Sequence, residues 1–323
     1  MAVQLDGYES CPTVNEDGTV TVTEAESQNG YLCKAKDAYG DSYYYRGNVT
    51  NNYVKFAGFY WRIIRINGDG TVRVIYDGTS AHANGESSED RQIGTSDFNS
   101  SYNDNAYVGY MYGKTGASTY AETHANTNNS TIKTYLDTWY ENNIKGTTNE
   151  QYIADNIFCN DRSFASNNSG TGAGTSTTYY RWRNFVGDSN KDEPKKDEPN
   201  NNKMMLSCPQ KNDAFTVNDT SKGNGALTYG VGFVTTDEAV LAGDWNSDNS
   251  NYYLYSGQYY WTMSPDDFGG CCAVERLVYS PGPNGSHSRR VDTALGVRPV
   301  FNLKSEVLLQ GTGTASDPYH LAS

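Results

Sequence analysis

The segment YVKFAGFYWRIIRINGDGTVRVIYDG, Tyr53–Gly78, decides the fold that we expect for this chain. Its runs of β-branched and aromatic residues are separated by two turn signals, AG and NGDG. This pattern predicts three consecutive antiparallel strands. Because successive side chains of a strand point to opposite faces, we expect Phe59, Trp61 and Ile63 on one side of the sheet.

An amphipathic helix is predicted in STIKTYLDTWYENNIKG. Ser130 can cap its N-terminus and Gly146 can end it. The apolar positions recur with helical spacing and form one stripe, which consists of Ile132, Leu136, Trp139 and Tyr140. A second, short helix is expected in NEQYIADNIF.

The later part of the chain predicts one more helix and then further strands. In TTDEAVLAGDW, Thr235 and Glu238 have the spacing of a capping box, and Gly243 can terminate the helix. Strands are expected in NYYLY, QYYWTMS, AVERLVYS and GVRPVFNL. With strands at both ends and two main helices between them, the expected fold class is α+β.

The composition is that of a polar protein that is large enough to bury a core. The 323 residues suit one large domain or two ordinary ones, and 20% of them are charged while 36% are hydrophobic. A net charge of −13 argues against nucleic acid and against anionic membrane surfaces, because both select basic faces. We find no apolar run near the roughly 18 residues that a membrane span needs.

Four of the six cysteines are expected to form two disulfides. Cys11 and Cys33 flank the β-like run GTVTVTE, while Cys159 and Cys208 bracket the most irregular segment of the chain. A bridge between the second pair would close a loop of about fifty residues and stabilise the fold by roughly 4 kcal/mol. The alternative is four reduced, buried cysteines in a cytosolic protein. Without a CxxC pair, and with scattered histidines, we expect no metal site.

Two stretches are predicted to be irregular. Residues 79–128 are rich in Ser, Asn, Gly and Tyr and suggest long surface loops. NKDEPKKDEPNNNK repeats KDEP, is charged and is interrupted by proline, which predicts a disordered, solvated insertion at about 186–203. The start, MAVQLDG, lacks the layout of a signal peptide, so the protein is either cytosolic or exported by a segment outside this sequence. The cysteines favour an extracellular or cell-surface location.

The order of these motifs resembles a known family. YWRIIRI in an opening hairpin, an amphipathic helix, TTDEAVLAG, YYWTMSP, an irregular patch and GVRPV follow one another over roughly residues 50–318. This order is similar to the C-type-lectin-like fold of formylglycine-generating-enzyme-like domains and of the variable proteins of diversity-generating retroelements, including gut-bacterial surface proteins that end in a GVRPV-type strand. The resemblance implies a C-type-lectin-like domain at 51–323, with antiparallel strands, two main helices and long irregular insertions. Residues 1–50 would be a β-rich N-terminal extension.

In the retroelement-diversified proteins, the segment before the closing strand is rewritten by adenine-directed mutagenesis. An Asn codon rewritten in this way cannot become Lys, Glu, Gln, Met or Trp. DDFGGCCAVERLVYSPGPNGSHSRRVDTAL, Asp266–Leu295, lacks Lys, Gln, Met and Trp, and its only excluded residue is Glu275. The resemblance therefore implies a variable segment at about 266–295. The residues expected to belong to the fixed scaffold around it, the last three alternating with outward positions on a strand, are Trp261, Val297, Pro299 and Phe301.

We expect the variable segment to form an exposed ligand-binding face on paired strands and a turn. Aromatic residues and arginine can anchor a partner, while Ser, Gly and Asn adapt their hydrogen bonds. The adjacent Arg289 and Arg290 predict an acidic or carboxylate-bearing target that is held by bidentate contacts. The candidate binding residues are Asp266, Asp267, Phe268, Gly269, Gly270, Cys271, Cys272, Glu275, Arg276, Tyr279, Pro283, Asn284, Ser286, His287, Ser288, Arg289, Arg290 and Asp292.

Other interpretations of the same residues stay open. Cys271 and Cys272 could form a vicinal disulfide that acts as a redox switch. Asp266 and Asp267 could help to bind calcium, although that ion takes six to eight oxygen ligands. The charged residues of the segment could also be an ordinary solvated face.

The motifs of catalysis are missing from the sequence. We find no phosphate-binding glycine loop, no HExxH and no Ser-His-Asp order, and the late cysteines lack the arrangement that oxidases of the related fold require. We therefore expect a non-enzymatic surface receptor or adhesin without a cofactor, whose partner is a protein or a glycan on another cell or a phage. The alternatives are a fixed structural or pilus-associated adhesive module and a calcium-assisted glycan-binding lectin.

Overall fold

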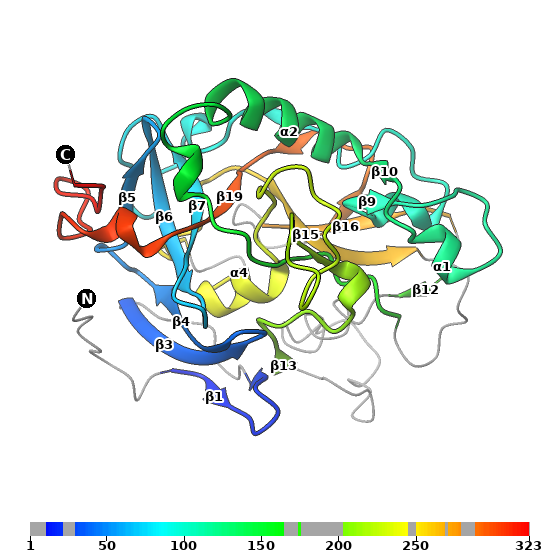
Figure 1. Cartoon of the computed structure of the whole chain (residues 1–323), viewed down its shortest axis with the longest axis horizontal. Coiled ribbons are helices and arrows are strands. Elements are labelled where there is room, and N and C mark those ends of the chain that lie inside the picture. Colours follow the sequence, from blue (N-terminus) through cyan, green and yellow to red (C-terminus); the bar gives the residue numbers. More distant parts are fainter. Residues whose placement is uncertain are drawn as a thin grey trace.

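The computed structural model describes residues 11–21, 30–164, 174–175, 203–244, 250–268, 271–278 and 288–322. Two six-stranded sheets with mostly antiparallel pairing carry the fold, and helices pack around and between them (Figure 1). The architecture is thus a mixture of helices and mostly antiparallel sheets, as the α+β prediction requires. The insertion expected at 186–203 lies, apart from Lys203, outside the described residues.

The first sheet has the strand order β19-β7-β6-β4-β3, and β5 pairs with β6. The three strands predicted in Tyr53–Gly78 are confirmed, because β5, β6 and β7 follow one another as antiparallel neighbours. β4 also pairs with β6, so the domain boundary expected at residue 50 runs through one sheet. The strands are β3 (Gly30–Asp37), β4 (Gly40–Gly47), β5 (Tyr53–Phe56), β6 (Phe59–Ile66), β7 (Val72–Gly78) and β19 (Val300–Leu303).

The second sheet has the order β17-β16-β15-β18-β8, with β12 attached to β15. QYYWTMS and AVERLVYS supply β15 and β16, as expected. GVRPVFNL is divided between β18 and β19 and therefore connects the two sheets. The strands are β8 (Thr95–Ser96), β12 (Gly174–Thr175), β15 (Tyr260–Phe268), β16 (Val274–Val278), β17 (Ser288–Arg290) and β18 (Leu295–Gly296).

The prediction of a strand in NYYLY is wrong. This segment is buried but forms turns and bends. Its backbone carbonyls serve arginines instead of a neighbouring strand: those of Tyr253 and Tyr255 accept hydrogen bonds from Arg91, and that of Leu254 accepts one from Arg298. Buried guanidinium groups need such acceptors, and they therefore determine the backbone here.

Shorter elements complete the described chain. They form a three-stranded sheet near the N-terminus, two two-stranded ribbons and several single turns of helix. These elements are β1 (Thr13–Val14), β2 (Val20–Thr21), β13 (Lys203–Met204), β9 (Met111–Tyr112), β10 (Asn128–Asn129), β11 (Phe158–Cys159), β14 (Ala214–Phe215), α1 (Tyr120–Thr123), η2 (Glu89–Arg91), η3 (Asn105–Val108), η4 (Glu150–Tyr152), η5 (Lys211–Asp213) and η6 (Ser305–Leu308).

Both main helices lie where the sequence predicts them. Helix α2 (Thr131–Asn143) begins after Ser130, whose hydroxyl accepts the N–H of Lys133. Helix α4 (Thr236–Ala242) has the predicted capping box and ends at Gly243, which has a φ of 121°. The short helix expected in NEQYIADNIF is only the 3₁₀ turn η4. The residues that follow it form β-bridges with β19 and β14, so their backbone groups are not available for helical hydrogen bonds.

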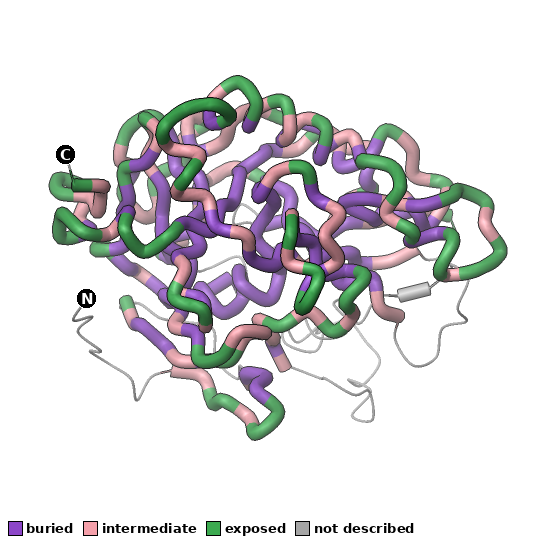
Figure 2. Tube along the Cα trace, viewed as in Figure 1, coloured by how far each residue is buried: buried purple, intermediate pink, exposed green. Residues whose placement is uncertain are grey.

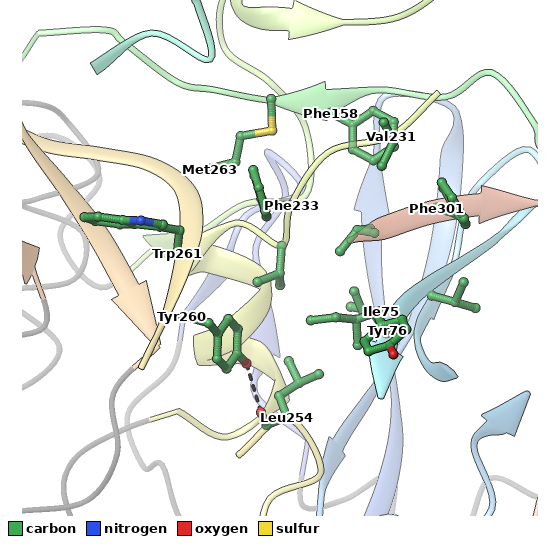
Figure 3. Close-up of a cluster of buried hydrophobic side chains, with 14 of the residues drawn as sticks. Ile75, Tyr76, Phe158, Val231, Phe233, Leu254, Tyr260, Trp261, Met263 and Phe301 are labelled. Carbon is green, nitrogen blue, oxygen red and sulfur yellow. Dashed lines mark hydrogen bonds between the residues drawn. The ribbon is translucent and has the colours of Figure 1, made fainter. Parts of the chain in front are cut away.

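The hydrophobic core lies between the two sheets (Figures 2 and 3). Trp261 and Met263 of β15 meet residues of β7 and Phe301 of β19 in one cluster (Figure 3). Trp261, Val297 and Phe301 are fully buried, in agreement with a scaffold role. The expected alternation along GVRPV is wrong, because Arg298 is buried as well and both sides of this segment are covered.

Helix α4 is joined to the first sheet by a buried carboxylate. Oε1 of Glu238 lies 3.0 Å from Nε of Arg65 and 2.6 Å from Nε of Arg73, on β6 and β7. The other oxygen accepts the N–H of Thr235 at 3.0 Å. Burial raises the pKa of Glu238, but the two arginines outweigh it, so the pKa is lowered and the carboxylate stays ionised.

A second buried carboxylate, that of Asp77, forms ion pairs with three arginines. Oδ1 lies 2.8 Å from Nε of Arg91 and 2.9 Å from Nη2 of Arg298, and Oδ2 lies 3.9 Å from Nη1 of Arg62. The remaining guanidinium donors of these arginines bond mainly to backbone carbonyls. Arginines of YWRII and GVRPV are therefore part of the core.

Both predicted disulfides are present. Cys11 bonds to Cys33 and Cys159 bonds to Cys208, with Cα atoms 5.6 and 5.4 Å apart. The second bridge ties β11 to the segment that leads into β14. In the described part of the chain, no helix has the length and apolar character of a membrane span.

Replacing Glu238 by glutamine should destabilise the fold by about 3–5 kcal/mol, because Arg73 would stay buried without the carboxylate that pairs with it. The free energy of unfolding from urea denaturation measures this cost. Glu306→Gln, at an exposed position of η6, is the matched control and should leave the free energy nearly unchanged. A cost for Glu238→Gln equal to that of the control would contradict the assignment.

Candidate functional site

The predicted binding segment forms one edge of the second sheet. β17 is the last strand in the order and pairs with β16, which pairs with β15. The register places Glu275 beside Arg289 and Pro265, with register shifts along β15. Seven of the candidate residues lie outside the described chain, namely Gly269, Gly270, Tyr279, Pro283, Asn284, Ser286 and His287.

Three candidate residues are buried, so the expectation that they are exposed is wrong. Asp266, Glu275 and Arg276 are 4%, 0% and 1% exposed. Nη2 of Arg276 forms an ion pair with Oδ1 of Asp266, which joins β16 to β15. Helix α4 packs against both strands. The sequence pattern of the segment did not reveal this buried pair, because its two members are ten positions apart.

Among the described residues, no basic side chain forms an ion pair with Glu275, although Arg162 and Arg276 act on it from a greater distance. Neither of its carboxylate oxygens makes a hydrogen bond to the described residues. Burial, followed by the negative charge of Asp266, raises the pKa of Glu275 well above its ordinary value. Burial also raises the pKa of Asp244 to about 7, against the opposing charge of Arg276. Burial therefore favours the protonated form of Glu275.

We call the three buried residues Asp266, Glu275 and Arg276 the support of this face. The remaining described candidates lie around the support and form its rim. Cys271 is exposed, and it is bonded to Cys272, which is partly exposed. The vicinal disulfide that the sequence left open is thus present, and all six cysteines of the chain are bonded. Asp267 and Phe268 at the end of β15 are half-buried, and Phe268 packs against the main core.

Arg290 is the most exposed residue of β17 and is already engaged within the chain. Its guanidinium lies 3.9 Å from the ring centre of Tyr102. Its Nε and Nη2 donate to the two carboxylate oxygens of Asp292 at 2.6 and 2.9 Å. Nη1 of Arg289 donates to the carbonyl of Ser288. Asp292 therefore occupies the Nε–Nη2 edge of Arg290, and a carboxylate ligand would have to bind the Nη1–Nη2 edge or displace Asp292.

A histidine cluster outside this face was not predicted from the sequence. Nδ1 of His82 lies 2.8 Å from Glu86 and its Nε2 lies 2.9 Å from Asp90, with the hydroxyl of Ser80 at 3.5 Å. Burial lowers the pKa of His82. Hydrogen bonds to Asp90 and Glu86 raise it by more, so the net shift of the pKa is upward. Because both ring nitrogens of His82 face carboxylates, neither is left to take a proton from Ser80, so this arrangement does not make a nucleophile.

His124 is also buried, and neither of its ring nitrogens makes a hydrogen bond to the described residues. Its ring centre lies 4.3 Å from that of Tyr120, with the two rings tilted by 57°. Burial, assisted by the charge of Arg162, lowers the pKa of His124 to about 2. Among the described residues, no group of three or more His, Cys, Asp or Glu side chains is arranged to hold a metal ion.

Comparisons of this chain with protein-family models, with curated proteins and with solved structures find no match. The C-type-lectin-like fold and the retroelement family therefore stay predictions. The mixture of helices with mostly antiparallel sheets rests on the structure itself.

Arg276→Ser and Arg290→Ser form a matched pair on adjacent strands. We expect Arg276→Ser to cost about 3–5 kcal/mol, because it removes the guanidinium that pairs with the buried carboxylate of Asp266. Arg290→Ser should leave stability nearly unchanged, because its ion pair is exposed to solvent. Urea denaturation of both variants measures the difference. Equal costs would show that the rim and the support are not separate layers.

Glu275→Gln should change how stability depends on pH. The folded chain keeps the Glu275 proton where the unfolded chain, with a pKa of about 4.3, has lost it, so this group lowers stability as pH rises above that value. Glutamine cannot ionise. The free energy of unfolding of the variant relative to the wild type should therefore increase from pH 4 to pH 7. A difference that is constant with pH would contradict the burial of an acidic proton at this position.

Proposed function

We propose that the protein is a non-enzymatic ligand-binding protein of the extracellular space or cell surface. Its binding face is the edge formed by β17, the end of β15 and the Cys271–Cys272 turn. The observation that carries this proposal is the division of the candidate segment into a buried support and a rim of exposed and half-buried residues. The rigid support and the accessible rim are the two requirements of an adaptable binding surface.

The support consists of groups whose replacement would disturb the core. Arg276 and Asp266 neutralise each other inside the sheet, and the side-chain oxygens of Glu275 lie nearby without a hydrogen bond to the described part of the chain. Burial of this kind tolerates few substitutions, because an unpaired charge at such a position costs several kcal/mol. These three residues would therefore stay constant while the rim changes.

The rim offers contacts whose loss would leave the fold intact. Arg290 stacked on Tyr102 provides a flat cationic and aromatic surface, and guanidinium and aromatic groups are common anchors at interfaces. Ser288 and Asp292 add hydroxyl and carboxylate groups next to it. The ligand would be a protein or a glycan on another cell or a phage.

We further propose that this rim is diversified by a retroelement, on a C-type-lectin-like scaffold. Glu275 is the one residue of Asp266–Leu295 that adenine-directed rewriting of an Asn codon could not produce. It is also fully buried, where a constant residue is required. This agreement supports the proposal, as do the three disulfides, which suit an oxidising compartment.

Sequencing this gene and its flanking DNA across a population of the source organism tests the proposal. Substitutions should concentrate at adenine-derived positions in codons for rim residues such as Cys271 and Arg290, with a near-copy of the segment nearby. Codons for Asp266, Glu275 and Arg276, and those for YYWTMSP and GVRPV, should stay constant. A segment as invariant as its flanks would reject diversification and favour a fixed adhesive module.

A further inference from the structure

A groove with a volume of about 430 Å³, open to solvent, runs along helix α2. Its wall is the helix face that carries Tyr135 and Trp139, and Ser96 of β8 lies on the other side. Small-molecule sites commonly enclose roughly 300–1,000 Å³. The volume of this groove is thus sufficient for a ligand of several rings.

The two aromatic side chains of the groove are held in place. The ring of Trp139 lies 5.6 Å from that of Phe59 and 6.1 Å from that of Phe301, so core residues support one side of it while it stays partly exposed. The hydroxyl of Tyr135 donates to the carbonyl of Ile93 at 3.3 Å, which fixes the second ring. Rigid aromatic rings give contact area at a low cost in conformational entropy.

Between and beside these rings the groove is lined with uncharged hydrogen-bonding groups. The hydroxyls of Thr134 and Thr138 donate to the carbonyls four residues earlier, so their oxygens stay available as acceptors. The side-chain amide of Asn142 is exposed and makes no hydrogen bond to the described chain, so it can both donate and accept. The lining contains no charged side chain.

We propose that this groove binds a neutral saccharide without a metal ion. A sugar ring has an apolar C–H face that can stack on Trp139 or Tyr135, and hydroxyls at its edge that can bond to Asn142 and the threonines. A sialylated or otherwise charged glycan would find no counter-charge in the lining. A proline-rich peptide could use the aromatic rings but would leave the threonine and asparagine groups unpaired, which costs free energy.

This site is separate from the proposed binding face. Ser96 lies on β8, the last strand at one edge of the second sheet, whereas β17 is the last strand at the other edge. The saccharide groove therefore does not rest on the proposed function, and either can fail without the other.

An array of oligosaccharides tests the groove, with the full-length, disulfide-bonded protein kept in EDTA. The array carries neutral oligomers of glucose, mannose, galactose and N-acetylglucosamine, sialylated oligosaccharides, and a proline-rich peptide. We expect binding to at least one neutral oligomer and to neither of the other probe classes. Calorimetry with the bound oligomer then gives the Kd for the variants.

Thr138→Arg should weaken binding at least about tenfold, because a long charged side chain would fill the groove. Asn142→Arg is a second variant at an exposed helical position, where arginine favours the helix. Thr148→Arg, exposed and outside the groove, is the matched control and should not change the Kd. Three results would overturn the proposal: no neutral oligomer bound in EDTA, affinity unchanged in both groove variants, or binding only to the sialylated or peptide probes.

Discussion

The arrangement of the two sheets depends on the ion pairs that the carboxylate of Glu238 forms with Arg65 and Arg73. The carboxylate holds the N-terminal turn of α4 against Arg65 and Arg73 of the first sheet, while Arg46 of β4 donates to the carbonyls of Val240 and Leu241 at the other end of the helix. Side chains of the first sheet thus bind polar groups at both ends of α4. Because α4 also packs against β15 and β16, the candidate binding face rests on a helix that is anchored from the opposite side.

The same use of arginine explains the irregular backbone of the core. A guanidinium has five donors and remains charged when buried, so it needs several acceptors at once. Asp77 cannot satisfy Arg62, Arg91 and Arg298 alone. Carbonyls of non-repetitive segments supply many of the other acceptors, and the carbonyl of Tyr76 on β7 supplies one more. Buried arginines are therefore associated with turns and bends in the middle of the molecule, where regular strands would have used those carbonyls in their own ladders.

Local signals in the sequence predicted the elements well, whereas long-range contacts were not predictable. The turns inside Tyr53–Gly78 and the capping box of Thr235 depend on neighbouring residues, and both are confirmed. NYYLY has the composition of a strand, but its backbone carbonyls accept hydrogen bonds from arginines that are far away in the sequence. The burial of Arg276 follows from a partner on another strand and from a helix some forty residues earlier, which no periodicity within β16 reveals.

The second sheet offers different surfaces at its two edges, and the reason lies in how each edge is supported. At the β17 edge the support is the buried pair of Arg276 and Asp266, and the described groups outside it are exposed or half-buried and make mainly local contacts. At the β8 edge the indole N–H of Trp261 donates to the carbonyl of Ser96, so the core fixes the strand that borders the groove. Changes at the first edge would leave the hydrogen bond of Trp261 untouched. A protein built in this way can alter one surface while a fixed, aromatic surface keeps its shape at the other.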